Sequence, residues 1–281
     1  MSTPTPSPTA LRDLALEVAR SAAVLVRERR AAGVSVADTK TSATDVVTEV
    51  DRASEEHIRA LLLAARPDDS ILGEEGDDHV GTSGVLWVVD PIDGTVNFLY
   101  GLPQYAISIA AEVDGTVVAG AVLDVVTGVE YAAALGAGST RDGVPLRVRP
   151  PAELSHHLVL TGFSYRPDLR AEQAQQVARL LPRVRDLRRI GSSALDICHV
   201  AEGAGDAYVE EGSQRWDWSA AALVATEAGA RFGLLRSAVA PALGGPGSDG
   251  TPTVVVCTPE AGWDAFVGLL TECGFVVGAE E

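Results

Sequence analysis

The stretch that decides the fold is VLWVVDPIDGTVNF, which runs from Val85 to Phe98. Its opening run, VLWVV, is apolar throughout, as in a strand buried on both faces. Pro91 has a fixed φ and no N–H to donate, so we expect the strand to stop there. Gly94 lets the backbone approach a ligand closely, and Thr95 can open a short helix whose free N–H groups favour an anion.

The same stretch carries two carboxylates, Asp90 and Asp93. Carboxylate oxygens are ligands that Mg²⁺ prefers, and the peptide carbonyl of Ile92 could supply a further oxygen. Asp-Pro and Asp-Gly are also common turn dipeptides between two elements. The stretch therefore indicates either a plain turn or a site for metal and phosphate, and the rest of the chain has to decide.

The composition indicates a globular chain with a large core. It has 281 residues, of which 46% are hydrophobic and 5% aromatic, enough for one large domain or two packed subdomains. The N-terminal MSTPTPSPT does not have the pattern of a signal peptide. No run of about 18 uncharged apolar residues occurs, so we expect no membrane span.

Net charge and cysteine spacing further restrict the class of protein that this chain can be. The net charge of −17 argues against non-specific nucleic-acid binding, which depends on basic patches. An anionic substrate would then need bound divalent cations, which invert the field inside an acidic pocket. Cys198, Cys257 and Cys273 have unrelated spacings and form neither a disulfide framework nor a zinc pattern, so we expect a cytoplasmic protein.

Residues 1–150 are expected to form an N-terminal half of helices and an antiparallel meander. Apolar residues at helical spacing predict helices over 11–30 and 52–65. The acidic, Gly-rich run 71–76 is typical of a solvated loop. Between 105 and 148, apolar runs separated by Asp114-Gly115 and Thr127-Gly128 predict hairpins.

Residues 151–281 are expected to form a C-terminal half in which helices and strands alternate, packed with the first half as one unit. Strands are predicted at 157–162, 187–190, 205–211, 230–235 and 253–257, and helices at 170–181, from 192, at 218–228 and at the end of the chain. The run 237–251 is rich in Gly and Pro and is predicted to be a surface loop.

Three further acids have ordinary interpretations when each is considered alone. Asp51 lies at the start of the second predicted helix, and Asp217 lies between two tryptophans at the start of an Ala-rich helix. Both suit helix capping, and Glu74 belongs to the acidic loop. Their order along the chain, together with the Asp90 to Asp93 stretch, favours a shared site.

The chain carries Gly73-Glu74-Glu75, then DPIDGT followed by Asn-Phe, then Trp216-Asp217 with a downstream Glu-Ala-Gly. From about residue 40 to 229 it thereby resembles the inositol monophosphatase family of magnesium-dependent, lithium-sensitive phosphatases. The segment RRIGSSALDICHVAEGAGDAYVEEG resembles the inositol-phosphatase branch of that family. The resemblance implies an α/β (α+β) fold, a layered αβαβα sandwich, in a homodimer with the site between the two halves.

The resemblance also implies a role for each matching residue. The implied Mg²⁺ ligands are Glu74, Asp90, the carbonyl of Ile92, Asp93 and Asp217, for two ions per site with a third allowed. Glu74 and Thr95 match the pair that orients the attacking water, and Asp51 matches the acid that supports Thr95. The amides of Gly94 and Thr95 match those that hold the phosphate. The positions facing the substrate hydroxyls are Asp93, Ser193, Glu210 and Asp217, with Gly191 and Ser192 in the same loop, and Lys40 matches a basic residue near the entrance.

Two features depart from the family pattern. Ser192 stands at a threonine-like position and Ser193 at an alanine-like one, which bears on substrate preference. Arg215, directly before Trp216, is a charge that many relatives lack, and the sequence offers no reason for it.

The expected reaction is hydrolysis of myo-inositol monophosphate to inositol and phosphate. Water attacks phosphorus directly, because no motif places a cysteine or histidine as nucleophile, and cations stabilise the leaving alkoxide. Glu210 and the small polar residues before it suit a ring of hydroxyls. Histidinol phosphate is the next candidate, and fructose 1,6-bisphosphate, 3′-phosphoadenosine compounds and NADP are cleaved on the same scaffold. An alternative of another class is a regulatory partner of transcription complexes, which no basic patch or interaction tail supports.

Overall fold

The apolar and alternating runs between residues 70 and 145 form one seven-stranded sheet. The computed structural model describes residues 6–33, 36–39, 46–239 and 253–277. In order across the sheet the strands are β3 (Ser70–Gly73), β4 (Val85–Asp93), β5 (Ala106–Val113), β6 (Thr116–Asp124), β7 (Glu130–Ala134), β8 (Gly138–Arg141) and β9 (Val144–Pro145). β3 and β4 are parallel, and the later pairs are antiparallel, which confirms the predicted meander.

The C-terminal residues supply a second sheet of five strands. Their order is β11 (Asp186–Arg188), β10 (Leu158–Thr161), β12 (Ala207–Glu211), β14 (Thr253–Pro259) and β13 (Ala230–Arg236). β10 is parallel to both of its neighbours, whereas β14 is antiparallel to β12 and β13. A separate antiparallel pair, β1 (Val36–Thr39) and β2 (Val46–Thr48), precedes the first sheet.

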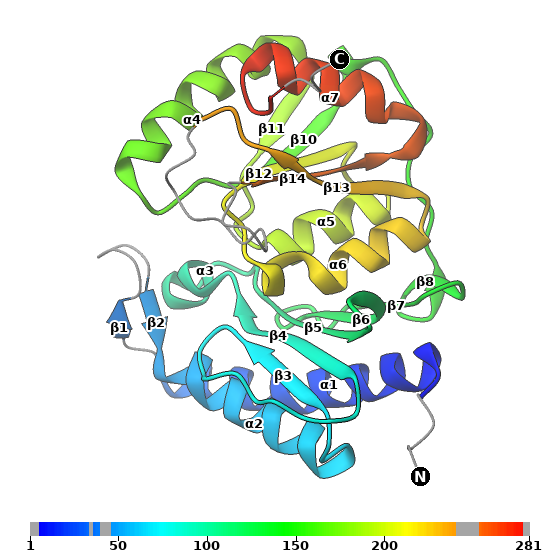
Figure 1. Ribbon diagram of the computed structural model, residues 1–281. Coiled ribbons are helices and arrows are strands. Elements are labelled where there is room, and N and C mark those ends of the chain that lie inside the picture. The colour runs from blue at the N-terminus through cyan, green and yellow to red at the C-terminus, as the bar shows by residue number, and fades with distance from the viewer. Residues whose placement is uncertain (1–5, 34–35, 40–45, 240–252, 278–281) are drawn as a thin grey trace.

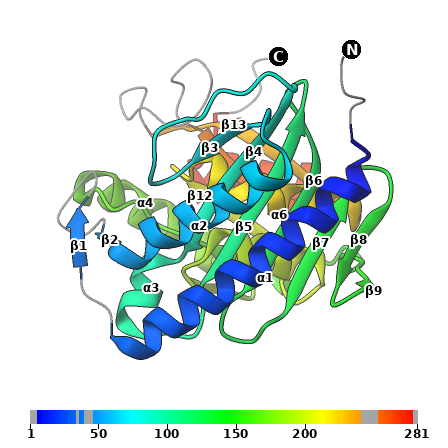
Figure 2. The same cartoon turned by 90° about the horizontal axis from the view of Figure 1, so that it is seen from below.

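Helices form the other three layers (Figure 1). Helices α1 (Pro8–Ala32) and α2 (Glu49–Ala65) cover the outer face of the seven-stranded sheet (Figure 2), and α5 (Ser193–Ala201) and α6 (Arg215–Glu227) lie between the sheets. Helices α4 (Pro167–Leu180) and α7 (Trp263–Cys273) cover the far side, and the short α3 (Thr95–Tyr100) follows β4. The αβαβα sandwich is confirmed. Among the described residues, no helix has the length and apolar character needed to cross a membrane.

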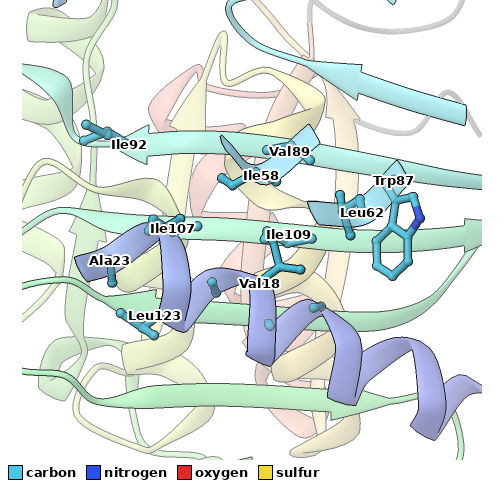
Figure 3. Packing of buried hydrophobic residues seen from close by; sticks show 14 of the residues in the cluster. Val18, Ala23, Ile58, Leu62, Trp87, Val89, Ile92, Ile107, Ile109 and Leu123 are labelled. Atoms are coloured by element: carbon cyan, nitrogen blue, oxygen red, sulfur yellow. The ribbon is translucent and has the colours of Figure 1, made fainter. Parts of the chain in front are cut away.

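Small side chains bring the layers close together. Ala15, Ala19 and Ala22 of α1 are fully buried, and Figure 3 shows the neighbouring Val18 facing Ile109 of the sheet. On the other face of the sheet, a Cβ at Gly120 of β6 would lie 2.7 Å from the carbonyl oxygen of Ala220 in α6. Because Gly120 has no Cβ, the backbone of α6 packs directly on the sheet, which fixes the position of the α6 N-terminus.

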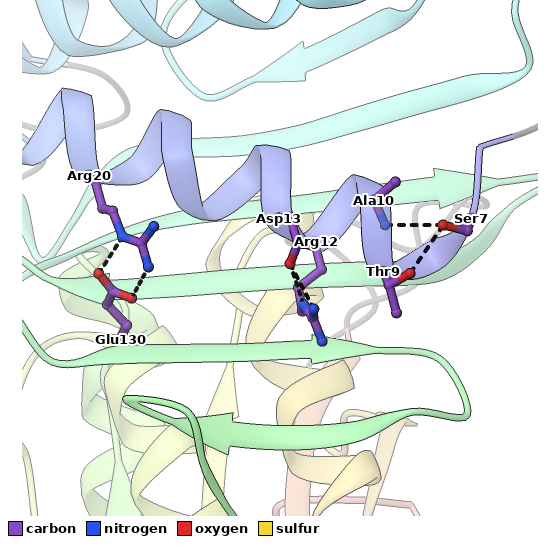
Figure 4. Close-up of polar contacts among 7 residues, drawn as sticks. All are labelled: Ser7, Thr9, Ala10, Arg12, Asp13, Arg20 and Glu130. Atoms are coloured by element: carbon purple, nitrogen blue, oxygen red, sulfur yellow. Dashed lines mark hydrogen bonds and ion pairs between the residues drawn. The ribbon is translucent and has the colours of Figure 1, made fainter.

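Ion pairs contribute less to this arrangement than packing does. Arg20 of α1 and Glu130 at the start of β7 form a two-point ion pair, with both N–O distances at 2.6 Å (Figure 4). Both side chains reach solvent, where such pairs contribute about 0–1 kcal/mol. The position of α1 is therefore set by its apolar face.

Several predicted boundaries were wrong, some of them for a local reason. β4 does not stop at Pro91 but continues to Asp93, because Pro91 and Ile92 together lie opposite Ile107 in a β-bulge that tolerates the missing N–H. Residues 71–73 of the acidic run belong to β3, where Ile71 is buried. Helices α1, α2, α4 and α6 each begin three residues before the predicted start. For α2 and α6 the reason is that Thr48 and Gln214 cap them in capping boxes.

Other predicted elements agree with the structure within a few residues. Lys40 and residues 240–251 of the predicted surface loop lie outside the described residues.

Candidate active site

The end of β4 forms a buried corner. Asp90 and Asp93 lie on either side of the bulge and are almost fully buried. The N–H of Ile92 donates to Oδ1 of Asp90 at 3.0 Å, which fixes the Asp90 side chain. The bulge matters because it inserts one extra residue, so that the Asp90 and Asp93 side chains reach the same region.

Gly94 makes the turn that follows, in a backbone conformation suited to glycine. Its φ of 97° and ψ of 37° are left-handed, and a Cβ would lie 2.9 Å from the carbonyl oxygen of Gly191. Nδ2 of Asn97 donates to the carbonyl oxygens of Gln104 at 2.8 Å and Ile190 at 2.9 Å. The corner is therefore tied directly to the loop before α5, in the C-terminal half.

Asp51 combines capping with a contact to the corner. Its Oδ2 accepts the N–H of Thr48 at 2.9 Å in the capping box of α2, and its Oδ1 accepts the hydroxyl of Thr95 at 3.0 Å. The Thr95 hydroxyl also lies 3.1 Å from the carbonyl oxygen of Ile92. The capping interpretation is confirmed, and the second carboxylate oxygen is in contact with Thr95, as the predicted supporting role of Asp51 requires.

Glu74 reaches the corner through strand pairing. Gly73 at the end of β3 is in register with Val89 of β4, so Glu74 comes beside Asp90. Burial raises the pKa of Asp90 well above its ordinary value, and the negative charges of Glu74, Asp93 and Asp217 raise it further. Four carboxylates from three separate segments therefore repel one another at this point.

Asp217 enters from the third segment, the first turn of α6. Its Oδ2 accepts the N–H of Gln214 at 2.6 Å in the helix cap. Burial raises the pKa of Asp217 well above its ordinary value, and Glu74 and Asp93 add to the rise. The carbonyl oxygen of Trp216 accepts the hydroxyl of Ser108 at 3.2 Å, so β5 holds this turn.

The structure accounts for Arg215. Its guanidinium pairs with both carboxylate oxygens of Glu112, a buried residue of β5, and the Nε–Oε1 distance is 3.1 Å. Ser108 lies four residues earlier on the same strand. The ion pair therefore adds a second link between β5 and the turn that carries Asp217.

The loop before α5 supports Asp93. Ser192 donates its hydroxyl to Oδ2 of Asp93 at 2.5 Å, and the N–H of Ala194 donates to the same oxygen at 2.7 Å. Burial raises the pKa of Asp93 to about 6, and these two hydrogen bonds limit the rise. Ser192 is itself buried and committed to this contact.

Glu210 at the end of β12 faces the corner from the second sheet. Its Oε2 accepts the hydroxyl of Tyr208 at 2.7 Å and that of Ser193 at 3.2 Å. Burial raises the pKa of Glu210 as well. A Cβ at Gly162 would lie 2.0 Å from that carboxylate, so glycine makes room for it.

These groups line one cavity of about 520 Å³ between the two halves. Every predicted site residue within the described chain lines it except Asp51, which lies behind Thr95. The structure brings the following predicted residues to the cavity wall: Glu74, Asp90, Ile92, Asp93, Gly94, Thr95, Gly191, Ser192, Ser193, Glu210 and Asp217. Among the described residues, no cysteine or histidine lines the cavity.

The donor set fits a divalent cation in chemical type. Glu74, Asp90, Asp93 and Asp217 are hard oxygen donors whose mutual repulsion a cation would relieve. In the part of the chain that the structure describes, no three Asp, Glu, His or Cys side chains are already arranged to hold a metal ion.

Sequence reasoning missed two residues that support the site, Glu55 and Tyr208. Glu55 follows Asp51 by four residues on α2, and Tyr208 precedes Glu210 by two residues on β12. Helical and strand periodicity place each on the same face as its partner. That spacing was the signal available in the sequence.

Comparison with known proteins agrees with this geometry. The model of the inositol monophosphatase family matches residues 8–262. Inositol-1-monophosphatase SuhB of Mycobacterium tuberculosis is 47% identical over 265 residues, covering 88% of this chain and 90% of the relative. Nus factor SuhB of Pseudomonas aeruginosa is 38% identical, covering 77% of this chain and 82% of the relative.

A solved structure of Mycobacterium tuberculosis SuhB superposes with a TM-score of 0.81 at 42% identity, covering 97% of this chain and all of that one. Its fold is thus shared along nearly the whole chain. The chain belongs to the inositol monophosphatase family, a membership that supports phosphatase activity.

Proposed function

We propose that the protein is a Mg²⁺-dependent phosphomonoesterase that hydrolyses myo-inositol monophosphate to inositol and inorganic phosphate. The observation that carries the proposal is the convergence of Glu74, the Asp90 to Asp93 corner and Asp217 on one cavity, opposite Glu210. A structural role alone would not require these four carboxylates, two of them almost fully buried, to repel one another. A site for cations and an anionic ester gives that arrangement a purpose.

Glu74, Asp90, Asp93, Asp217 and the carbonyl of Ile92 would hold the cations. When bound, divalent cations neutralise charge on the phosphate and the leaving oxygen and lower the pKa of water. The P–O bond of a phosphate monoester is among the slowest biological bonds to hydrolyse, so the transition state needs large electrostatic stabilisation.

Thr95 and Glu74 would orient the attacking water. The Thr95 hydroxyl donates a hydrogen bond to Oδ1 of Asp51, 3.0 Å away, which leaves the lone pairs of Oγ1 free to accept a hydrogen bond from the attacking water. Glu74 would take one proton from that water. The water oxygen would then bond to phosphorus as the ester P–O bond breaks, the leaving alkoxide would take a proton from solvent water to give the alcohol, and Glu74 would return its proton to solvent.

The remaining groups would bind the substrate. The amides of Gly94 and Thr95 would donate to phosphate oxygens, and Ser193 and Glu210 would bond to ring hydroxyls. The Oε2 of Glu210 already accepts two hydroxyl groups from the protein, which orients the carboxylate for a polyol. This is the basis for preferring inositol phosphate over histidinol phosphate, whose amine and imidazole need different partners.

Phosphate release from inositol 1-phosphate, with Mg²⁺ and with excess chelator, tests the proposal. We expect activity only with Mg²⁺, inhibition by Li⁺, and loss of activity in Asp93→Asn. Asp264→Asn is a matched control, because Asp264 is exposed on α7, in the layer beyond the second sheet. Activity that survives chelation would refute the metal mechanism.

A substrate panel separates the candidates that share the scaffold. Inositol 1-phosphate should have a higher kcat/KM than histidinol phosphate, fructose 1,6-bisphosphate, 3′-phosphoadenosine compounds or NADP. A preference for histidinol phosphate would retain the phosphatase and replace the substrate. Light scattering of the purified protein would test the proposed homodimer.

The support for a second function is that several relatives are named Nus factors. The Pseudomonas aeruginosa relative, at 38% identity, is named a Nus factor. We therefore propose as the alternative that this chain binds transcription complexes independently of catalysis. Retention of purified RNA polymerase by the Asp93→Asn protein, at the level seen with wild type, would support it, and no retention by either protein would exclude it.

A further inference from the structure

Glu55 is a buried carboxylate in contact with the loop after β3. It lies on α2 and is only 2% exposed. Its Oε2 accepts the backbone N–H of Glu75 at 2.8 Å, and its Oε1 accepts that of Gly76 at 2.9 Å. Arg59, one helical turn further on, donates Nε to Oε1 at 2.7 Å and fixes the carboxylate. Both oxygens are therefore bonded to the same short loop.

Glu55 also contacts the loop on the other side of Glu74. A Cβ at Gly73 would lie 2.3 Å from Oε1 of Glu55, so the carboxylate packs directly against that backbone. Gly73 is in turn paired with Val89 of β4. The backbone on both sides of Glu74 is thus held by contacts that do not involve the Glu74 side chain.

This restraint opposes a specific force. Strand pairing places Glu74 beside Asp90, because Gly73 is in register with Val89, and two neighbouring carboxylates repel each other when both are ionised. A loose loop would relieve the repulsion by moving Glu74 away, and binding a cation would then have to order the loop again. Two charge-assisted hydrogen bonds from a buried carboxylate resist that movement.

We propose that Glu55 is a positioning residue that holds the Glu74 loop against this repulsion and so prepares the site for a cation. The inference rests on the proposed function, in which Glu74 is a cation ligand. Glu55 lies behind the loop and does not line the cavity. Its effect on cation binding passes through Glu74.

Mg²⁺ binding measured by titration calorimetry tests this in wild type, Glu55→Gln and Glu56→Gln. Glutamine keeps the size but has only one acceptor oxygen, so one loop amide loses its partner. We expect Glu55→Gln to weaken Mg²⁺ binding about tenfold, as when other outer partners of metal ligands are lost. Glu56 is the next residue and is exposed, so its variant should bind as wild type does.

Two further measurements connect the effect to the loop. In hydrogen exchange without Mg²⁺, the amides of Glu75 and Gly76 should exchange faster in Glu55→Gln than in wild type. Gly73→Ala should weaken Mg²⁺ binding as well, because the new Cβ displaces the carboxylate while Glu55 remains. This variant keeps the test available if Glu55→Gln does not fold.

A double variant decides whether Glu55 acts through Glu74. In a Glu74→Gln background, adding Glu55→Gln should leave Mg²⁺ affinity unchanged. An equal tenfold loss in that background, or affinity within twofold of wild type in the folded single variants, would overturn the proposal. Wild-type protein that binds no Mg²⁺ would refute the proposed function itself, and with it the cation role of Glu55. Unchanged exchange at Glu75 and Gly76 would refute the restraint alone.

Discussion

The buried Asp93 makes stability depend on pH in a defined direction. Burial raises the pKa of its carboxyl from 3.8 to about 6. A rise of about two units corresponds to ~3 kcal/mol. Between these values the folded protein keeps a proton that the unfolded chain releases, so the free energy of unfolding falls as pH rises. The stabilisation is fully present below pH ~4 and is lost above pH ~6, in the absence of a cation.

Asp93→Asn removes this titration. Asparagine has nearly the same shape and can still accept the hydroxyl of Ser192, but it carries no charge at any pH. Urea unfolding in chelator between pH 4 and 6.5 should give a wild-type curve that falls by ~3 kcal/mol more than the variant curve. Asp90, Asp217 and Glu210 titrate in both proteins, so the difference between the two curves reports the carboxyl of Asp93 together with its coupling to Asp90 and Asp217.

Mg²⁺ supplies the second arm of the same experiment. A cation stabilises the ionised carboxylates, so added Mg²⁺ should stabilise the wild type more at pH 7 than at pH 5. Asp264→Asn should follow the wild type throughout, because Asp264 is exposed. If wild type and Asp93→Asn keep a constant separation from pH 4 to 6.5 in chelator, the carboxyl does not titrate as the buried geometry requires and the reasoning is refuted.

Three other predictions follow from single contacts. Arg215→Met leaves the buried Glu112 unpaired. Breaking a buried ion pair costs about 3–5 kcal/mol, but the Arg215 side chain is 36% exposed, so we expect the free energy of unfolding in urea to fall by ~2 kcal/mol and to be restored by adding Glu112→Leu. A fall below ~0.5 kcal/mol would show that the ion pair does not stabilise the fold. Gly94→Ala forces a side chain into a left-handed φ of 97° at a cost of ~1–2 kcal/mol and should lower kcat/KM at least tenfold; unchanged kinetics would mean that the turn tolerates a Cβ. Thr95→Val should lower kcat about a hundredfold and Thr95→Ser should retain most activity, so equal loss in both would mean that the hydroxyl shared with Asp51 is not what matters.

The corner could be predicted from sequence because its signals are local. Five residues from Asp90 to Gly94 follow one apolar run, and the chemistry of proline, glycine and carboxylates applies to each of them. Asp217 could be predicted for a similar reason, since it lies between two tryptophans in the first turn of an apolar, Ala-rich helix. Local signals of this kind identify the Asp90 to Gly94 stretch and Asp217 as candidates, but they do not give the distance between the two.

What the sequence could not supply was the partner of each charged group. Arg215 and Glu112 are 103 residues apart, and their pairing depends on α6 packing across β5. Glu55 shows its role only once β3 is placed beside β4. Ser192 looked like a substrate contact, yet its hydroxyl is turned to Asp93. In each case the decisive fact is the packing of one layer on another, which no window of sequence contains.

The charges that line the cavity explain why an anionic substrate would need bound cations in order to bind. Of the described residues that line it, the only cations are Arg166 and Arg189, and Arg166 is already paired with Asp168. Lys40, the single lysine of the sequence, lies outside the described residues. A phosphate that enters this cavity without a cation meets mostly carboxylates. The pKa values of Asp90, Asp93 and Asp217 are raised, in part by their negatively charged neighbours. With divalent cations present the sign of the local field reverses, so the same carboxylates that repel an anionic ester become the reason it is held.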